Sequence, residues 1–306
     1  PTAPPPASPT ASPTAAVDPG VSSMGDPHLH LAKGGKTDFR GVNGTSYVLL
    51  SGPGCSFATT TFDSTFLLPR PMLVDGSFFV RASWRLRGRS GVEYGVLSDA
   101  NALLTRVVRL VGNNATALKT LSGVWQEWKE DGLRVYHKQS SVFVRGNGYE
   151  TNVTRKPIYN YVSGPSHWRY DVAMRQFDGS TGFESAHGRA SATCFPHGIL
   201  GQSYDGSDVA VDGKVDSYKY DPKKPVVRTS AMGEGAIEGV ASDYAVLGGS
   251  SYGHAFKYSR YDQSATSSCK PRDPTKLSGA KRVADKSLVV ASSDSDDNML
   301  EWKKRR

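Results

Sequence analysis

The chain has 306 residues, of which 38% are hydrophobic and 10% aromatic, enough apolar material to build one large or two ordinary domains. No run of about 18 apolar residues occurs, so the sequence predicts no membrane-spanning segment. The formal net charge of +8 suits an anionic partner. The basic residues are dispersed, however, and form no basic helix with interleaved aromatics, which argues against nucleic acid as that partner.

The first 23 residues differ in composition from the rest. They are almost entirely Pro, Ala, Ser and Thr, and the prolines favour extended polyproline II backbone with no apolar face to bury. Residues 1–23 are therefore predicted to be a linker or stalk, either disordered or stiffened by O-linked glycans. Because the sequence begins with Pro rather than Met, we interpret it as a processed or truncated product. The polar residues 263–306 are predicted to be a second tail.

Two long segments show the alternation that is typical of half-buried strands. In residues 77–87 apolar side chains fall on one face and arginines on the other, and the same period of two returns in residues 168–175. The predicted inward residues are Val80, Ala82, Trp84 and Leu86 in the first segment and Trp168, Tyr170, Val172 and Met174 in the second.

Shorter strand candidates, separated by Gly-rich or Asn-rich turns, fill much of the remaining sequence. They are residues 46–50, 56–62, 105–111, 124–128, 133–138 and 142–145, and residues 254–261 also resemble a strand. Short helices are expected only within residues 98–104 and 235–247. Frequent turn signals favour an antiparallel β-sandwich over a parallel sheet with crossover helices, so the predicted fold class is all-β with extended arms at both ends.

Two motifs mark the ends of the predicted domain. The first is Gly25-Asp26-Pro27-His28, followed by Thr-Asp-Phe-Arg-Gly at residues 37–41 and by a strand that contains Tyr47. This succession resembles the opening of the von Willebrand factor type D domain, GDPHxxTFDG. The second motif, His-Gly-Ile-Leu-Gly-Gln at residues 197–202, resembles the HGxLGQ segment of inter-alpha-trypsin inhibitor heavy chains and plant root-cap proteins. The resemblance implies a divergent type D-like domain at residues 24–262.

The cysteine content departs from that family. The chain has three cysteines, Cys55, Cys194 and Cys269, and no CxxC pair, so at most one intramolecular disulfide can form. Among the three possible pairings, Cys55–Cys194 is the first choice. The family's dense disulfide framework does not occur, which argues against disulfide-linked polymerisation of the mucin kind.

In some members of the resembled family the Asp–Pro bond of GDPH cleaves itself. The Asp26 carboxyl can attack its own carbonyl carbon, the tertiary amide nitrogen of Pro27 is a comparatively basic leaving group, and His28 is near enough to supply a proton. The alternative, which we favour, is that Asp26 and His28 hold the turn before the first strand. No motif for another reaction occurs, so the sequence offers no positive argument for an enzyme.

A loop rich in Gly and Asp follows Cys194. Its candidate calcium ligands are Gln202, Asp205, Asp208, Asp212 and Asp216, because calcium prefers flexible sites made of oxygen ligands. The spacing does not match an EF-hand, but the corresponding turn of the resembled family often binds calcium. The alternative is that these are ordinary turn aspartates.

Three sequons, at Asn43, Asn114 and Asn152, are candidate N-glycosylation sites. Together with the Pro-rich segment they favour the secretory route and an extracellular or cell-surface location.

Outward-facing Arg81, Arg85 and Arg87 form a basic stripe that is a candidate site for sulfated or carboxylated glycans. The alternative is a solvated strand face.

The favoured function is a structural or adhesive glycoprotein module, a building block of a cell-surface layer or filament that assembles with copies of itself or with other surface glycoproteins. The alternative is a monomeric module on a stalk that recognises calcium or an acidic polysaccharide, and a glycan-active enzyme is the third hypothesis. Exposed strand edges pair with other chains unless something covers them. The Pro-rich arm or the C-terminal tail is a candidate cover.

Overall fold

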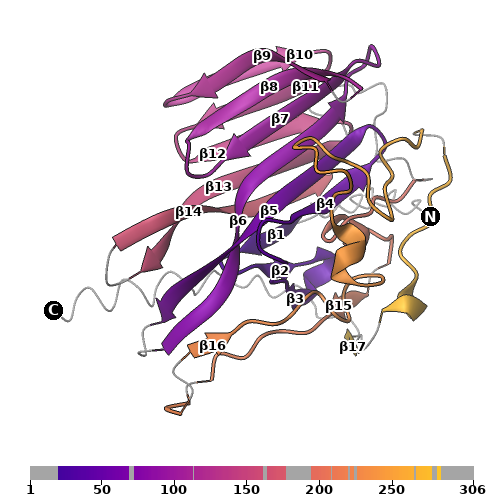
Figure 1. Ribbon diagram of the computed structural model, residues 1–306. Coiled ribbons are helices and arrows are strands. Elements are labelled where there is room, and N and C mark those ends of the chain that lie inside the picture. Colours follow the sequence, from indigo (N-terminus) through magenta and orange to yellow (C-terminus); the bar gives the residue numbers. More distant parts are fainter. Residues whose placement is uncertain are drawn as a thin grey trace, which may run out of the picture.

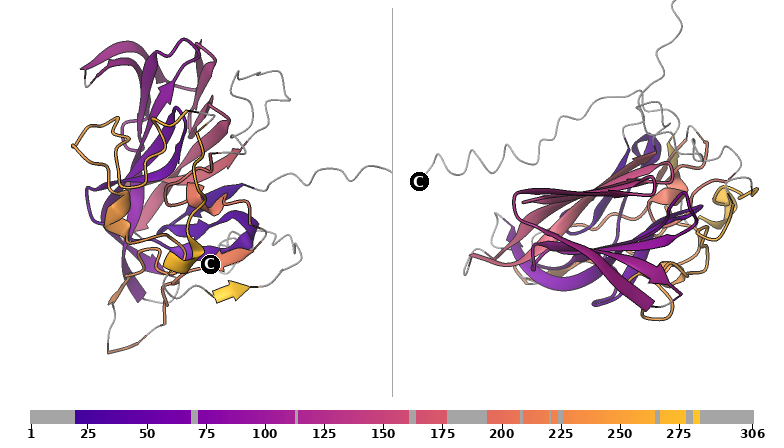
Figure 2. Two further views of the ribbon diagram at one scale, coloured as in Figure 1. Left: turned by 90° about the vertical axis from the view of Figure 1, so that its right-hand side faces the viewer. Right: turned by 90° about the horizontal axis from the view of Figure 1, so that it is seen from above.

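The computed structural model describes residues 20–68, 72–112, 114–160, 164–176, 194–207, 209–219, 221–223, 226–264, 267–277 and 281–283. Two antiparallel sheets pack face to face (Figures 1 and 2), which confirms the predicted all-β sandwich. The two predicted arms lie mostly outside the described residues. Within those residues, no helix has the length and apolar character that a membrane crossing requires.

The first sheet, called sheet 1 here, has eight strands in the order β10-β11-β12-β13-β14-β1-β2-β3. Its strands are β1 (Val21–Met24), β2 (His28–His30), β3 (Lys36–Asp38), β10 (Trp125–Glu130), β11 (Leu133–Lys138), β12 (Ser141–Gly146), β13 (Tyr149–Asn160) and β14 (Gly164–Gln176).

The second sheet, sheet 2, runs in the order β4-β5-β6-β7-β8-β9, and β16 pairs in parallel with the first part of β6. Its strands are β4 (Ser46–Gly52), β5 (Cys55–Leu68), β6 (Met72–Arg87), β7 (Glu93–Asp99), β8 (Leu104–Val111), β9 (Asn114–Ser122) and β16 (Val226–Arg228). A small separate pair joins β15 (Ala210–Asp212) to β17 (Lys281–Val283), and the 3₁₀ turns are η1 (Ala32–Gly34), η2 (Gly201–Ser203), η3 (Ala241–Tyr244) and η4 (Pro274–Lys276).

The predicted strands and their inward faces are largely confirmed. All six shorter strand candidates up to residue 145 are strands, and the predicted inward residues of β14 pack in or against the core. In β6, Ala82, Trp84 and Leu86 are buried, but Val80 is only half-buried. The register of β5 against β6 shifts at this point, so Val80 is the extra residue of a bulge and its side chain leaves the inward row.

Three local predictions need correction. Residues 100–103 form the turn between β7 and β8, where a helix was expected at residues 98–104. Within residues 235–247 the only described helical element is the 3₁₀ turn η3. Residues 254–261 are turns rather than a strand. Their aromatic side chains mimic a strand pattern because they pack on the sandwich: Phe256 and Tyr261 are buried while the intervening backbone turns.

Polar contacts cross the apolar core and fix how the sheets face each other. The Trp84 ring stacks on Phe57 with 4.9 Å between centroids, and its indole N–H donates to the Thr151 hydroxyl of sheet 1 at 2.7 Å. The Ser98 and Tyr170 hydroxyls, one from each sheet, are also 2.7 Å apart. Buried polar groups must find partners, so these pairs specify one alignment of the two sheets.

The later part of the chain covers one end of the sandwich. The segment around residues 197–200 pairs with the outer edge of β4, with the Ile199 N–H donating to the Val48 carbonyl at 3.0 Å. The outer edge of β3 is covered in the same way, because the Asp38 N–H donates to the Lys214 carbonyl at 2.9 Å. At the other end, at the top of Figure 1, β9 and β10 are the outermost strands of their sheets.

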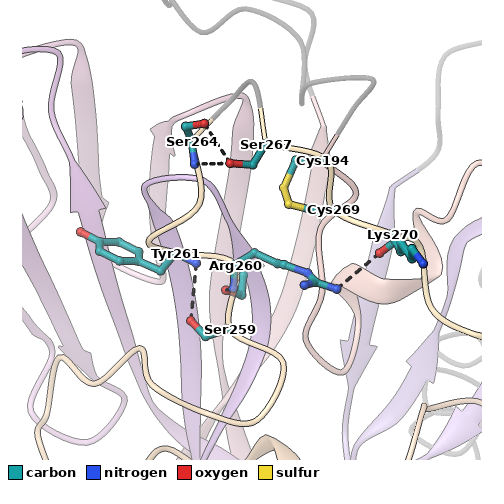
Figure 3. Close-up of a disulfide and its surroundings, with 9 residues drawn as sticks. Cys194, Ser259, Arg260, Tyr261, Ser264, Ser267, Cys269 and Lys270 are labelled. Carbon is teal, nitrogen blue, oxygen red and sulfur yellow. Dashed lines mark hydrogen bonds between the residues drawn. A yellow bond between two sulfur atoms is a disulfide. The ribbon is translucent and has the colours of Figure 1, made fainter.

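The disulfide prediction Cys55–Cys194 is wrong. Cys194 is bonded to Cys269 (Figure 3), and Cys55 is a buried free thiol whose pKa burial raises to about 12. The Cys55 side chain points into the core from the start of β5, whereas residues 194 and 269 run side by side as an isolated parallel bridge. The folded part therefore reaches beyond the predicted boundary at residue 262, and Arg272 is also buried.

Candidate functional site

The Gly-Asp-Pro-His motif forms the turn between β1 and β2. Gly25 has a φ of +69°, a backbone conformation that favours glycine, and Met24 pairs with His28 across the turn. The Gly25 N–H donates to the carboxylate of Asp171 in β14 at 3.0 Å. The motif is thus the opening turn of the folded chain, held by a neighbouring strand.

Asp26 joins this turn to sheet 2. Its buried carboxyl group accepts hydrogen bonds from the Ser77 N–H at 2.8 Å and the Tyr218 hydroxyl at 3.1 Å. A Cβ on Gly76 would come within 2.6 Å of this carboxyl group, so only glycine leaves it room. Burial raises the pKa of Asp26, although the hydrogen bonds from Ser77 and Tyr218 and the charge of His28 oppose the rise.

His28 binds the second acidic residue of the motif region. Its Nδ1 lies 2.7 Å from a carboxylate oxygen of Asp38, and the other Asp38 oxygen accepts the Asp216 N–H at 2.8 Å. Burial by itself lowers the pKa of His28, but the hydrogen bond and charge of Asp38 outweigh it, so the net pKa is raised. The Tyr218 ring and the imidazole pack edge to face, with 5.9 Å between ring centroids.

We expect the Asp26–Pro27 bond to remain intact. Both oxygens of the Asp26 carboxyl group are engaged, its raised pKa leaves less of the nucleophilic carboxylate at mildly acidic pH, and His28 is bonded to Asp38. The measurement is intact mass after incubation near pH 5, beside an Asp26→Asn control. A product that begins at Pro27 and does not form in the control would contradict this prediction.

Arg40, from the Thr-Asp-Phe-Arg-Gly sequence, lies behind the turn. Its buried guanidinium donates to the carboxylates of Asp63 at 2.9 Å and Asp75 at 3.1 Å and to the Thr229 carbonyl at 3.2 Å. The Ser77 hydroxyl donates to the Arg40 carbonyl. This arginine therefore ties the β5–β6 pair to the segment that contains β16.

The His-Gly-Ile-Leu-Gly-Gln motif forms the segment that covers β4. Gly198 has a φ of +103°, and a Cβ there would come within 2.6 Å of the Leu49 backbone. The buried Gln202 side-chain amide fixes the segment at residues 238–244. Its NH2 group donates to the Tyr244 hydroxyl and its oxygen accepts the Glu238 N–H, both at 2.9 Å. The two motifs are far apart in the sequence, but both hold other segments of the chain against the edges of the sheets.

His197 is the buried titratable residue of this second motif. Its side chain is 1% exposed and stacks on the Tyr258 ring with 4.5 Å between centroids, and neither ring nitrogen has a hydrogen-bond partner among the described residues. A Glu238 carboxylate oxygen lies 3.6 Å from Nε2. Burial, aided by the charge of Arg260 and opposed by Glu238, lowers the pKa of His197 to about 4.

The protein is expected to lose stability as the pH falls from about 6.5 towards 4, because the unfolded chain then binds a proton that folded His197 excludes. The effect of this residue is at most about 3 kcal/mol. Urea unfolding at pH 7 and pH 4.5 measures it, with His197→Phe as the variant that keeps the ring stack. An equal loss in the variant would show that other groups, such as Glu93 with its lowered pKa, cause the dependence.

The candidate calcium ligands do not converge where the structure describes them. Asp205 binds Arg272 at 2.8 Å, Asp212 accepts the Lys36 N–H at 2.8 Å, and Asp216 accepts N–H groups of residues 230 and 231. Asp208 lies outside the described residues. Across the described ranges, no three His, Cys, Asp or Glu side chains gather where a metal could be held. Calcium binding stays a prediction without a defined site.

The predicted basic stripe is largely neutralised. Arg85 and Arg87 both bind Glu93, at 2.5 Å and 3.2 Å, and Arg81 lies 3.3 Å from Asp99. The pairing of β7 with β6 places Glu93 directly opposite Arg87. The stripe carries less uncompensated charge than the sequence of β6 alone predicts.

The three sequons lie at different places. Asn43 is exposed in the turn before β4, Asn114 is the exposed first residue of β9, and Asn152 is half-buried on the outer face of the central strand β13. Glycosylation at these positions remains a prediction.

The sequence analysis missed residues that form hydrogen bonds with the two motifs. Ser77, Tyr218 and Glu238 come from segments far along the chain from the motifs they contact. No local pattern marks them, since a serine in a strand and a tyrosine in a polar loop are common. Gly76 within the long strand β6 was the one available signal, because glycine inside a strand often marks a close approach.

No model of a known protein family matches this chain, and no curated protein is significantly similar to it.

Proposed function

We propose that this protein is a structural or adhesive module that assembles with copies of itself in an extracellular layer or filament. The observation that carries the proposal is the asymmetry of the sandwich edges. The chain's own later segments pair with the outer edges of β3 and β4. No described residue forms a ladder on the outer edges of β9 and β10.

The open end has the features of a pairing surface. Every residue of β9 except Leu121 is exposed. Side chains link β9 and β10 at the Ser122 N–H, which donates to Gln126, and at the Glu127 carbonyl, which accepts from Lys119. The backbone N–H and C=O groups that an edge strand leaves unpaired are a template for a strand of another chain. Exposed apolar side chains lie at the same end, namely Leu118 (42%), Val124 (77%) and Trp125 (56%). The bulge at Leu118 and the charge of Lys119 oppose unspecific pairing along this edge.

Other features support an extracellular place. A disulfide such as Cys194–Cys269 persists in oxidising compartments, and Asn43 and Asn114 are exposed sequon residues. The resemblance to type D domains belongs to the same proposal, because its two motifs both have structural roles in closing the sandwich.

Sedimentation velocity over a range of protein concentrations tests the proposal, with protein prepared without N-linked glycans. We expect reversible association of the wild type, weakened by Leu118→Lys on the open edge. The matched control is Val240→Lys, a charge placed at another exposed apolar residue (60%) outside β9 and β10. A wild type that stays monomeric at every concentration, or equal weakening by both variants, would contradict the proposal.

A further inference from the structure

The sequon residue Asn152 differs from the other two because its side chain lies on the face of a sheet. Its neighbours Thr151 and Val153 are buried, so the alternation of β13 turns Asn152 towards the outer face of sheet 1. Thr154, which completes the sequon, shares this face, and the Asn152 side-chain amide donates to its hydroxyl at 3.5 Å. The residue to be modified therefore lies between two paired strands, β12 and β14, rather than in a turn.

Two aromatic side chains lie beside Asn152 on the same face. Phe143 of β12 is directly opposite Asn152, and Tyr136 of β11 is directly opposite Phe143. The two ring centroids are 5.8 Å apart, the angle between the ring planes is 55°, and both side chains are half-buried. Directly opposite residues have Cβ atoms about 4.5–5.5 Å apart, so a sugar attached to the Asn152 nitrogen would begin beside the Phe143 ring.

The other side of Asn152 is lined by small residues. Its partner on β14 is Ala173, which is exposed and has a side chain of a single carbon. The next residue in the same row is Ser22 of β1, which lies opposite Ala173. A branched glycan therefore has room to leave the sheet over β14 and β1 while its first sugar stays on the aromatic side.

The polar groups around the two rings suit a neutral sugar rather than an anion. The Tyr136 hydroxyl accepts a hydrogen bond from Arg134 at 2.9 Å, which holds the ring in place. Glu127 of β10 lies directly opposite Tyr136 at the end of the row. A carboxylate repels anions but accepts hydrogen bonds from sugar hydroxyl groups.

We propose that Asn152 carries an N-linked glycan whose first N-acetylglucosamine stacks on Phe143 and lies against Tyr136, so that the protein's own glycan covers the outer face of β11–β13. The C–H groups on one face of a pyranose are apolar, and an aromatic ring offers them a large flat surface. The inference rests on the extracellular location proposed above, because N-linked glycans are added to secreted chains.

The covalent step joins the Asn152 side-chain nitrogen to the anomeric carbon of a lipid-linked oligosaccharide. The new C–N bond replaces the C–O bond from that carbon to the lipid pyrophosphate, which leaves, and the amide nitrogen loses one proton. One N–H remains on the nitrogen and can still donate to Thr154. Since Asn152 lies within a paired strand, the transfer would take place before the sheet forms.

The other two sequons provide controls within the same chain. Asn114 is the exposed first residue of β9 and lies opposite Val111, an aliphatic residue that is 67% exposed. Asn43 lies in the turn before β4, where its side-chain oxygen accepts the Asp63 N–H at 2.9 Å. A glycan at Asn114 therefore has an aliphatic side chain in the cross-strand position that the Phe143 ring has beside Asn152.

The test uses protein secreted from a eukaryotic host that makes high-mannose glycans, and begins with mass spectrometry of the peptide that contains Asn152. A variant with Asn43→Gln and Asn114→Gln carries its N-linked glycan at Asn152 alone, and an endoglycosidase trims this glycan to one N-acetylglucosamine. The same variant made without glycans is the reference. We expect the single sugar to raise the melting temperature by about 2–4 °C, as a good aromatic contact does in a protein of this size.

A ring substitution and a second glycan position separate stacking from simple shielding. Phe143→Leu keeps an apolar side chain but removes the ring, so it should abolish most of the shift. Each melt is compared with the unglycosylated form of the same variant, so a direct effect of the substitution on folding cancels. The matched control carries Asn43→Gln and Asn152→Gln, and its single sugar at Asn114 should raise the melting temperature less than half as much.

Nuclear magnetic resonance reports the stack directly, because protons above an aromatic ring are shifted upfield. The C–H protons of the first sugar should show this shift in the protein glycosylated at Asn152 and lose it with Phe143→Leu.

An unmodified Asn152 in the secreted protein would overturn the proposal. So would a melting shift no larger than that of the Asn114 glycan, or a shift that persists in Phe143→Leu. Self-association is tested on protein without N-linked glycans, so its outcome does not depend on Asn152 and either proposal can fail alone.

Discussion

Replacing both Cys194 and Cys269 with serine is expected to lower the free energy of unfolding by about 4 kcal/mol, the value that chain-entropy arguments give for a loop of this length. The two cysteines are 75 residues apart in sequence, so the bond restricts a large part of the unfolded chain. It also anchors the segment that covers β4, since Cys194 lies three residues before His197 and the Phe195 N–H donates to the Cys269 carbonyl at 3.2 Å.

Urea unfolding of the double serine variant measures this loss, and hydrogen exchange at the Ser51 N–H, which donates to the His197 carbonyl, reports on the β4 edge. The matched control is Cys55→Ala, which removes the third cysteine from the core without touching the disulfide. It is expected to cost about 1 kcal/mol. If the control lost as much stability as the double variant, the disulfide would not be the source of the effect.

The strands were predictable because their signal is local. The alternation in β6 and β14 reports the two faces of a strand directly, and the glycine-rich turns between β8 and β13 separate one strand from the next. The prediction failed at Val80 because a bulge depends on the partner strand β5, whose register is not encoded in β6 alone. The strand prediction failed at residues 254–261 because aromatic residues are common both in strands and in turns that pack on a core.

The sites were less predictable because they join distant segments. Asp26 and His28 were identified from the motif, and Asp38 lies opposite His28 in the local pairing of β2 with β3. Tyr218, the partner of Asp26, is set instead by how the later loop returns to β3. The predicted disulfide pairing was wrong for the same reason, because the true pairing depends on the path of the chain that brings residue 269 beside residue 194. The contact between Tyr136 and Phe143 was missed because aromatic residues are common in any strand, and only the cross-strand register shows that these two lie opposite each other.

The second large effect is expected from Arg40→Gln, which should lower the free energy of unfolding by about 3 kcal/mol, because removing one partner of a buried ion pair leaves the other charge uncompensated. The Arg40 side chain is 7% exposed, and its guanidinium serves the Asp63 and Asp75 carboxylates and the Thr229 carbonyl together. We take the lower end of the usual range because both carboxylates are 31% exposed and water replaces part of the lost contact.

Arg228→Gln is the matched control, because Arg228 binds the same Asp75 carboxylate at 3.3 Å from a side chain that is 70% exposed. Exposed ion pairs are worth about 1 kcal/mol or less, so urea unfolding should separate the two variants clearly. Equal losses would mean that burial of the Arg40 guanidinium does not set the strength of the contact. A large loss for Arg40→Gln alone would assign a structural role to the Thr-Asp-Phe-Arg-Gly sequence: its arginine holds β16 and the following loop against β6, behind the turn that Asp26 closes.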